Sequence, residues 1–160
     1  MLSLLALAAL AAEPPPRTVV VDPLTFALGY AHVQVEGRLG DHASLYAGPH
    51  LRLFDGILTE GHEPFIGIGA EVGARWFPWG AAPTGGWAMA RGVLARLSTT
   101  DGTKLVKPGG YGSVLVGYTG FVGHLVLSGG AGLNLLAYDI GGYGTSGPFP
   151  AAHTAIGVAF

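Results

Sequence analysis

Hydrophobic and polar residues alternate with a period of two along most of this chain. In the stretch from 66 to 76, for example, Ile66, Ile68 and Val72 share one face while Glu71 and Arg75 share the other. Because successive side chains of a strand point to opposite faces of a sheet, this pattern predicts β-strands. Seven strands are expected, at residues 31–39, 43–53, 66–76, 85–98, 111–122, 124–138 and 151–160.

The connections between these strands alternate in length. Short turns are expected at Gly40-Asp41, Pro78–Thr84 and Val122-Gly123, and longer loops at 55–63, 99–109 and 139–150. This layout is typical of outer-membrane barrels, which have an even number of strands. We therefore expect an eighth strand within residues 17–30, formed by Thr18–Val21 and ended by Asp22-Pro23. The predicted fold is an all-β, up-and-down antiparallel transmembrane barrel of about eight strands.

The strand at 85–98 is the least regular, because Trp87 and Met89 share a face with Arg91, and an arginine is costly on a face that meets lipid. A β-bulge between Arg91 and Arg96 is expected to turn both arginines inward.

The composition excludes several classes of protein. Glycine accounts for 28 of 160 residues, charged residues for 11% and hydrophobic residues for 49%, and the mean hydropathy is +0.45. Such a chain is too apolar to be disordered, and its glycines lack the period of three of collagen. Without cysteine there is no disulfide or zinc–thiolate site, and a net charge of −2 without a basic run argues against nucleic acid as a partner.

The apolar character instead points to a membrane. Beyond the N-terminus, no stretch has the roughly 18 or more apolar residues of a transmembrane helix. A closed β-barrel is the other structure that satisfies its backbone within lipid. Residues 1–12 are expected to form a signal peptide with Ala9-Leu10-Ala11 at its cleavage site, residues 13–17 an extended linker, and residues 18–160 the barrel.

The two ends of the predicted barrel resemble a known group. Asp22-Pro23-Leu24, Leu28-Gly29-Tyr30 and Leu39-Gly40-Asp41 resemble the opening of small, uncharacterised bacterial outer-membrane barrels, which belong with the eight-stranded OmpA/OmpX type. The alternating end Ile156, Val158 and Phe160 is similar to their C-terminal assembly signal. The resemblance implies a location in the bacterial outer membrane. It also implies lipopolysaccharide or phospholipid and the barrel-assembly machinery as partners, for a chain expected to be a monomer.

A narrow barrel with its apolar face turned to lipid must enclose its charged side chains. We expect an internal polar network with Glu36 and Glu71 as acceptors and arginines as donors, which fills the barrel instead of lining a pore. Its expected members are Glu36, Arg38, Arg52, Glu71, Arg75, Arg91 and Arg96. The aromatic residues Trp76, Trp79, Trp87, Tyr118 and Tyr138 lie near strand ends, where a girdle at the membrane interface is expected.

The histidines and serines provide no clear site. His32, His42, His50, His124 and His153 all fall on the inward face, but none has the helical spacing of a zinc protease. Ser44 with His42, or Ser128 with His124, offers a nucleophile and a base on one face, yet residues that fill a polar interior would look the same. No catalytic residue, metal ligand or cofactor is therefore predicted.

The function expected from the sequence is that of a non-enzymatic outer-membrane barrel with a structural or surface-interaction role, played by its three longer loops. Two alternatives stay open. One is a lipid-modifying barrel enzyme of the outer membrane. The other is a secreted soluble barrel that binds a small apolar ligand, which would require the Val, Leu and Ile side chains to face inward.

Overall fold

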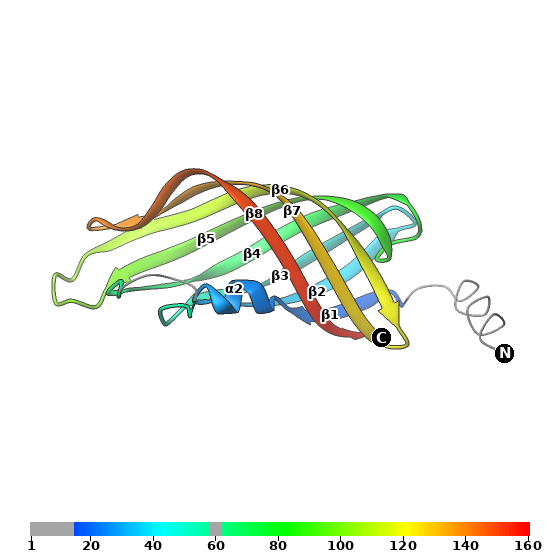
Figure 1. The fold of residues 1–160 in the computed structure, drawn as a ribbon, viewed down its shortest axis with the longest axis horizontal. Coiled ribbons are helices and arrows are strands. Elements are labelled where there is room, and N and C mark those ends of the chain that lie inside the picture. The colour runs from blue at the N-terminus through cyan, green and yellow to red at the C-terminus, as the bar shows by residue number, and fades with distance from the viewer. Residues whose placement is uncertain (1–14, 58–61) are drawn as a thin grey trace.

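Eight antiparallel strands form a single sheet that closes on itself in the computed structural model, which describes residues 15–57 and 62–160 (Figure 1). Each strand pairs with its neighbours in the chain, and β1 also pairs with β8. The strands are β1 (Arg17–Val21), β2 (Tyr30–Gly40), β3 (Ala43–Arg52), β4 (Phe65–Trp79), β5 (Gly85–Thr99), β6 (Val106–Val122), β7 (Leu125–Ile140) and β8 (Tyr143–Ala159). The all-β, up-and-down antiparallel architecture with eight strands is confirmed.

The eighth strand lies where the short valine run predicted it. Val19 in β1 pairs with Val35 of β2 on one side and with Val158 of β8 on the other, so this strand closes the ring. The strand ends just before Asp22, and the helix α2 (Pro23–Ala27) follows directly. Residues 1–12, the expected signal peptide, and the first two residues of the expected linker lie outside the described residues.

Two expected loops are shorter than predicted because strands extend into them. β6 begins at Val106 and β8 at Tyr143, so the predicted loops at 99–109 and 139–150 shrink to residues 100–105 and to the pair Gly141-Gly142. Both glycines of that pair have positive φ, as tight hairpins require. The glycine and proline content of residues 143–150 suggested a loop, but these residues belong to β8 and pair with β7 without a break.

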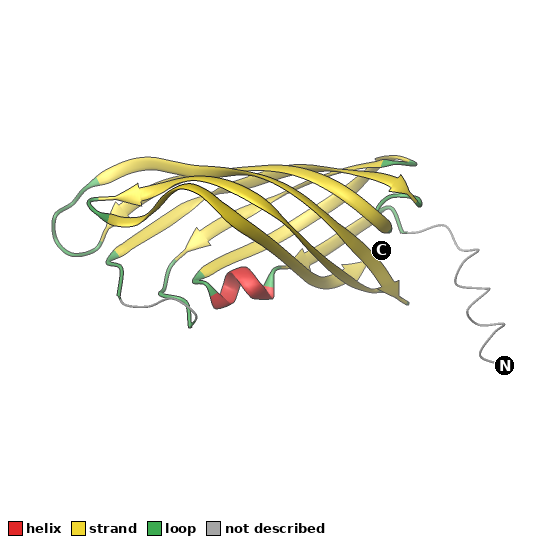
Figure 2. Ribbon diagram, turned by 45° about the horizontal axis from the view of Figure 1, so that its top comes forward, coloured by secondary structure: helices red, strands yellow, loops and turns green. Residues whose placement is uncertain are grey.

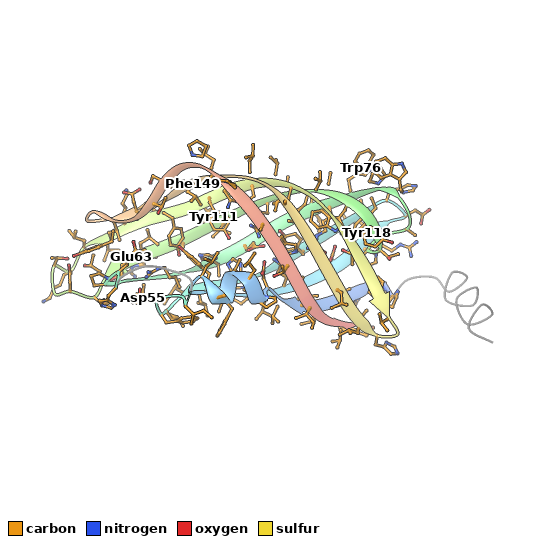
Figure 3. The ribbon with its side chains drawn as sticks, viewed as in Figure 1. Asp55, Glu63, Trp76, Tyr111, Tyr118 and Phe149 are labelled. Carbon is orange, nitrogen blue, oxygen red and sulfur yellow. The ribbon has the colours of Figure 1, made fainter. Side chains whose placement is uncertain are left out.

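The ring has two different ends. The turns β2–β3, β4–β5 and β6–β7 lie at the end where β8 finishes, with Trp76 and Tyr118 beside them (Figure 3). The opposite end carries the described loop residues 53–57 and 62–64, together with residues 100–105 and 141–142, and Asp55 and Glu63 are among them (Figure 3). The first two of these connections are longer than the turns, as predicted, whereas the third is a tight hairpin.

The outer face of the sheet is mainly apolar, and its inner face carries buried charged and polar side chains. Large apolar side chains point outward and are exposed, including Val72, Leu94, Val114, Val116, Leu133 and Leu135. Charged and polar side chains point inward and are buried, including Glu36, Glu71, Arg75, Arg91, His50 and His153. A water-soluble barrel has the reverse arrangement.

The expected bulge in β5 is absent. The register of β5 with both β4 and β6 runs without interruption from Arg91 to Arg96, so these two arginines, five residues apart, face opposite sides. Arg91 is buried inside and Arg96 is exposed outside. Trp87 and Met89 are inside with Arg91, which is the physical reason that no bulge is needed.

Glycines on neighbouring strands make room for the large inward rings. A Cβ atom at Gly117 or Gly130 would lie within 2.5 Å of the Trp87 ring, and one at Gly73 would lie as close to Tyr46. The inward glycines therefore accommodate aromatic rings.

The helix α2 takes the place that a longer β1 would fill (Figure 2). Asp22 caps its first turn by accepting hydrogen bonds from the backbone of Leu24 and Thr25, and Pro23 begins the helix without needing a partner for its nitrogen. Within residues 15–57 and 62–160, no helix is long and apolar enough to cross a membrane, since α2 has only five residues.

Candidate functional site

Two buried acidic residues organise the polar interior. Glu36 of β2 accepts a hydrogen bond from Nη1 of Arg75 at 2.6 Å and others from the hydroxyls of Ser44 and Thr18. The rings of Tyr46 and Trp87 lie on Arg75, each with its centroid 5.2 Å from the guanidinium carbon. A buried ion pair needs such additional bonds, because removing both charges from water costs several kcal/mol for each ion.

Glu71 of β4 is the second centre. Its Oε2 lies 2.5 Å from Nδ1 of His32, its Oε1 accepts from the amide of Gln34, and Nη1 of Arg91 lies 3.9 Å away. Nε2 of His32 lies 3.0 Å from Nδ1 of His50, and Nε2 of His50 lies 2.9 Å from the Tyr138 hydroxyl. When both imidazoles are neutral, these contacts form one directed row of hydrogen bonds. Tyr138 donates to Nε2 of His50, Nδ1 of His50 donates to Nε2 of His32, and Nδ1 of His32 donates to Glu71.

This row of groups also contains the donor atoms for a metal ion. One ligand atom each from His32, His50 and Glu71 lie within 4.8 Å of one another, in an arrangement of nitrogen and oxygen that suits zinc. All three side chains are buried and already hydrogen-bonded to one another. These contacts satisfy the three groups without an ion, so the geometry alone does not assign a metal.

A third group of contacts joins β8 to Asp22, the residue that caps the N-terminus of α2. Nε2 of His153 lies 3.0 Å from Nη2 of Arg75, and since arginine only donates, this nitrogen accepts. The proton of the neutral imidazole is therefore on Nδ1, which donates to Oδ2 of Asp22 at 3.1 Å. Asp22 also accepts from the hydroxyl of Thr154, so one carboxylate holds the helix cap and β8 together.

Apolar side chains lie on both sides of this polar layer. Towards the loop end, Phe65, Ala95, Leu97, Tyr138 and Ile140 form a buried cluster. Two further clusters contain Phe77, Ala82 and Trp87, and Val20, Val126 and Ala159. The interior is thus a packed core with a charged middle, and is less polar than its sequence alternation predicts.

The seven residues expected in the internal network separate into three groups. Glu36, Glu71, Arg75 and Arg91 come together inside the ring. Arg52 is buried but lies at the loop end, where it binds Asp55, Glu63 and the backbone oxygen of Phe65. Arg38 lies at a turn against Asp41, and Arg96 is exposed on the outer face, so neither belongs to the network.

Part of the expected aromatic girdle lies on the outside. Trp76, Trp79 and Tyr118 are exposed at the short-turn end. Trp87 and Tyr138 are each only 2% exposed and belong to the interior, so their placement in a girdle was wrong. Strand-end position alone does not distinguish the two faces, and the parity of Trp87 with Arg91 was the signal that could have placed it inside.

The two serine–histidine pairs are not formed. Ser44 donates to Glu36, while Nδ1 of His42 lies against the backbone oxygen of Phe77. Ser128 bonds to Thr119, and His124 bonds to the backbone oxygen of Ala159. Neither serine is hydrogen-bonded to the histidine that was expected to activate it as a nucleophile.

Asp55 organises the described part of the loop after β3. It contacts Nδ1 of His62 at 2.5 Å, accepts from the backbone nitrogen of Glu63, and pairs with Arg52. The hydrogen bond from His62, followed by that from the Glu63 backbone, holds the pKa of the Asp55 carboxyl below its ordinary value. Asp55 and the buried Arg52 thus anchor this loop to the rim of the ring.

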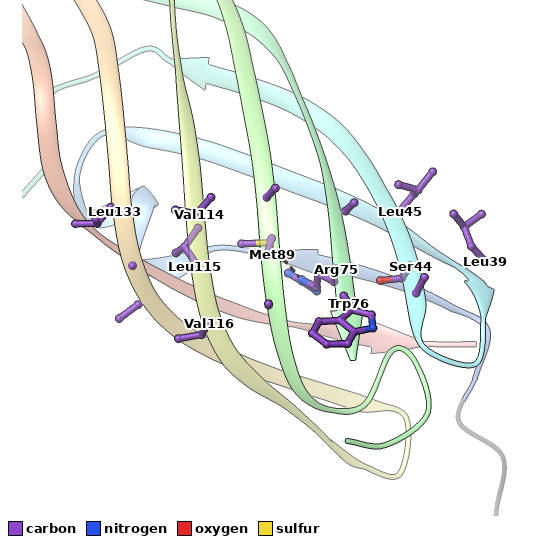
Figure 4. A pocket seen from close by; sticks show the side chains of 16 residues that line it. Leu39, Ser44, Leu45, Arg75, Trp76, Met89, Val114, Leu115, Val116 and Leu133 are labelled. Carbon is purple, nitrogen blue, oxygen red and sulfur yellow. Dashed lines mark hydrogen bonds between the residues drawn. The ribbon is translucent and has the colours of Figure 1, made fainter. Parts of the chain in front are cut away.

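The outer wall carries a shallow apolar depression over β3 to β7 (Figure 4). Alanines at 43, 74, 88, 90 and 131 form its floor, and Leu39, Trp76, Val116 and Leu133 stand around them. Small side chains beside large ones make this face uneven. The indole nitrogen of Trp76 is a polar group on this outward lining, and the other outward side chains named here are apolar.

Sequence reasoning missed two features of the interior. The contact of Asp22 with His153 and Thr154 joins residues about 130 positions apart, although an aspartate directly before a proline is a recognisable start signal for a helix. The row from Glu71 to Tyr138 depends on the register of distant strands, for which the chain carries no local signal.

Comparison with protein-family models, with curated protein sequences and with solved structures yields no match to this chain.

Proposed function

We propose that this chain is an integral β-barrel of the bacterial outer membrane, without catalytic activity, whose interior is filled and whose role is structural or one of surface interaction. The observation that carries the proposal is the inverted polarity of the sheet. Its outer face exposes large apolar side chains on successive strands, from Val72 to Leu135, while Glu36, Glu71 and Arg75 are enclosed. An apolar surface of this kind is stable against lipid and prone to aggregate in water.

Three further features support the proposal. Trp76, Trp79 and Tyr118 lie exposed near one rim, which is where aromatic residues favour the membrane interface. The strands close in a ring through the pairing of β1 with both β2 and β8, as hydrocarbon requires of a spanning sheet. Phe160 follows β8 with an exposed aromatic ring, and its backbone pairs with Arg17, in agreement with the proposed assembly signal.

The interior argues for a filled barrel. Eight strands enclose a space just wide enough for side chains, and here the buried ion pairs and the apolar clusters on either side of them occupy it. A conducting channel would need a continuous polar path. Interaction with partners would then fall to the loop end, where Asp55, Asp101 and Asp139 supply acidic groups outside the ring.

The secreted soluble barrel is less well supported, because it needs apolar residues inside and charges outside. The lipid-modifying enzyme lacks a serine paired with a histidine among the candidates from the sequence. The test is electrophoresis of the detergent-extracted protein with and without boiling, together with fractionation of the cells. We expect the protein in the outer-membrane fraction and a band that shifts on boiling. A protein that remains in the soluble fraction and shows no shift would overturn the proposal.

A further inference from the structure

Strand pairing around the ring is interrupted on one side, in the half nearer the loops. β1 pairs with β8 only from Ile156 to Ala159, and with β2 only from Val33 to Gly37. Nearer the loops, β8 has no strand partner on this side among the described residues. The helix α2 lies in this gap between β8 and the start of β2 and contacts both strands (Figure 1).

Two prolines follow the open edge of β8. The backbone nitrogens of Thr154 and Phe160 point toward the β1 side, where they meet Asp22 and Arg17. Pro148 and Pro150 have the same parity, so their nitrogens point into the gap. Proline has no N–H group, and its presence here removes two donors that would otherwise lie unpaired. The sequence is therefore suited to a strand edge that stays open.

A cavity of about 450 Å³ extends through this gap into the ring. It is bounded by Leu24 and Leu28 of α2 and its cap, by Pro150 and Ala152 on the outward parity of β8, and by Tyr111 and Asn134 from the inner face. A cavity lined by both faces of the sheet must cross the wall. Its size lies within the range of ligand-binding pockets. Figure 3 shows Phe149 of β8 and Tyr111 of β6, which also line it.

The polar end of this cavity is provided by Arg91. This residue lies on β5, which is opposite β1 in a ring of eight strands, so its side chain reaches toward the gap from the far wall. It is buried, since only 7% of its surface is exposed. Its Nε donates to Ser113, but its buried Nη1 has no hydrogen-bond partner among the described residues. A buried donor without an acceptor is costly, which points to an acceptor that the ligand supplies.

We propose that this cavity binds a single-chain amphiphile with an oxygen acceptor as its head, of which a long-chain fatty acid is the simplest, taken up sideways from the bilayer. The head accepts a hydrogen bond from Arg91, and the chain runs out between α2 and β8. The inference rests on the proposed membrane location, because only then does the gap open onto acyl chains.

The chemistry of the lining favours this ligand over the alternatives. The mouth, formed by Leu24, Leu28 and Pro150, suits a hydrocarbon chain and offers no charge to a bulky headgroup. Glu71 lies 3.9 Å from Arg91 and offsets part of its charge, so a carboxylate with one negative charge fits better than a phosphate with two. A diacyl phospholipid would have to bring its headgroup through the wall.

The test uses the full-length folded protein in detergent micelles, titrated with palmitate and observed by native mass spectrometry. Arg91→Met removes the donor, and Ala152→Phe fills the mouth. Arg96→Met and Ala131→Phe are the matched controls, since Arg96 lies on the outer face of the same strand and Ala131 is the register partner of Ala152 on β7. The boiling-dependent band shift of each variant verifies that it is folded.

We expect one palmitate per wild-type protein and no adduct with hexadecylamine, whose cationic head only donates. The association constant should fall about tenfold in Arg91→Met and at least as much in Ala152→Phe, and remain unchanged in both controls. Should Arg91→Met fail to fold, the comparison of Ala152→Phe with Ala131→Phe decides alone.

The inference is overturned if folded wild-type protein binds no palmitate, if it retains a phospholipid in its place, or if Ala152→Phe and Ala131→Phe bind equally. Retention of full affinity in a folded Arg91→Met variant would overturn the role of Arg91. Failure of the membrane proposal is recognised separately, because the wild-type protein would then lack the band shift.

Discussion

Asp22 and His153 are hydrogen-bonded across 131 positions of sequence, between the end of β1 and the middle of β8. The same carboxylate caps α2 through the backbone of Leu24 and Thr25 and accepts from the Thr154 hydroxyl. One buried side chain therefore fixes the helix beside the open edge of the ring. If α2 borders an entrance, as we infer, then Asp22 determines the geometry of that entrance.

Replacing Asp22 tests this role. Asp22→Ala removes the cap and leaves His153 and Thr154 without their acceptor, which should lower the free energy of unfolding by about 2–4 kcal/mol. Asp22→Asn keeps a capping oxygen and should cost less. The measurement is urea-induced unfolding of the refolded protein in lipid vesicles. Asp41→Ala, at the exposed pair with Arg38, serves as control and should change stability by no more than about 0.5 kcal/mol.

The Glu36–Arg75 pair should behave as a unit. Arg75→Met leaves the buried Glu36 carboxylate without its cation, at a cost of about 3–5 kcal/mol. Adding Glu36→Gln to Arg75→Met removes the unpaired charge. The double variant should therefore lose less free energy of unfolding than the two single variants lose together. A double-mutant cycle should give a coupling free energy of about 0.5–3 kcal/mol. Strictly additive effects would show that the two charges do not stabilise each other.

The pH dependence of the loop end follows from Asp55. Its pKa is lowered by the hydrogen bond from His62, so the folded loop favours the carboxylate. This contribution is fully present above the ordinary pKa of 3.8, and it is lost as the pH falls through the lower value of the folded state. An NMR titration of the Asp55 carboxyl should give a midpoint below 3.8. In His62→Ala the midpoint should rise, and an unchanged midpoint would exclude His62 as the main cause.

The sequence pattern predicted the strands because the outer face of the sheet is apolar at most of its large side chains. Ile68 and Val72 in β4, for example, share the outward parity and mark the outer face without reference to any neighbour. The short Val19–Val21 run was recognisable because the strand count was odd without it. Asp22-Pro23 marked its end, since proline there cannot continue a central strand.

What the sequence did not reveal depends on contacts between distant strands. Trp87 looked like a residue for the membrane interface, but Gly117 and Gly130 on the next two strands leave a space inside for its ring. That space is defined by register, and no local pattern reports it. Pro148 and Pro150 suggested a loop, because proline is unfavourable inside a paired strand. They lie in β8 because the strand edge that they face has no strand partner there, and the sequence does not reveal that β1 is too short to reach it.

The central claim is that the outer face of the ring contacts lipid, and one position tests it directly. The chain has no cysteine, so Val116→Cys, at a site 65% exposed in mid-strand, can carry a single spin label. In phospholipid vesicles, we predict that dissolved oxygen, which partitions into the bilayer, relaxes this label strongly and that a water-soluble nickel chelate does not. A label that is accessible to the nickel chelate and insensitive to the bilayer would contradict the account.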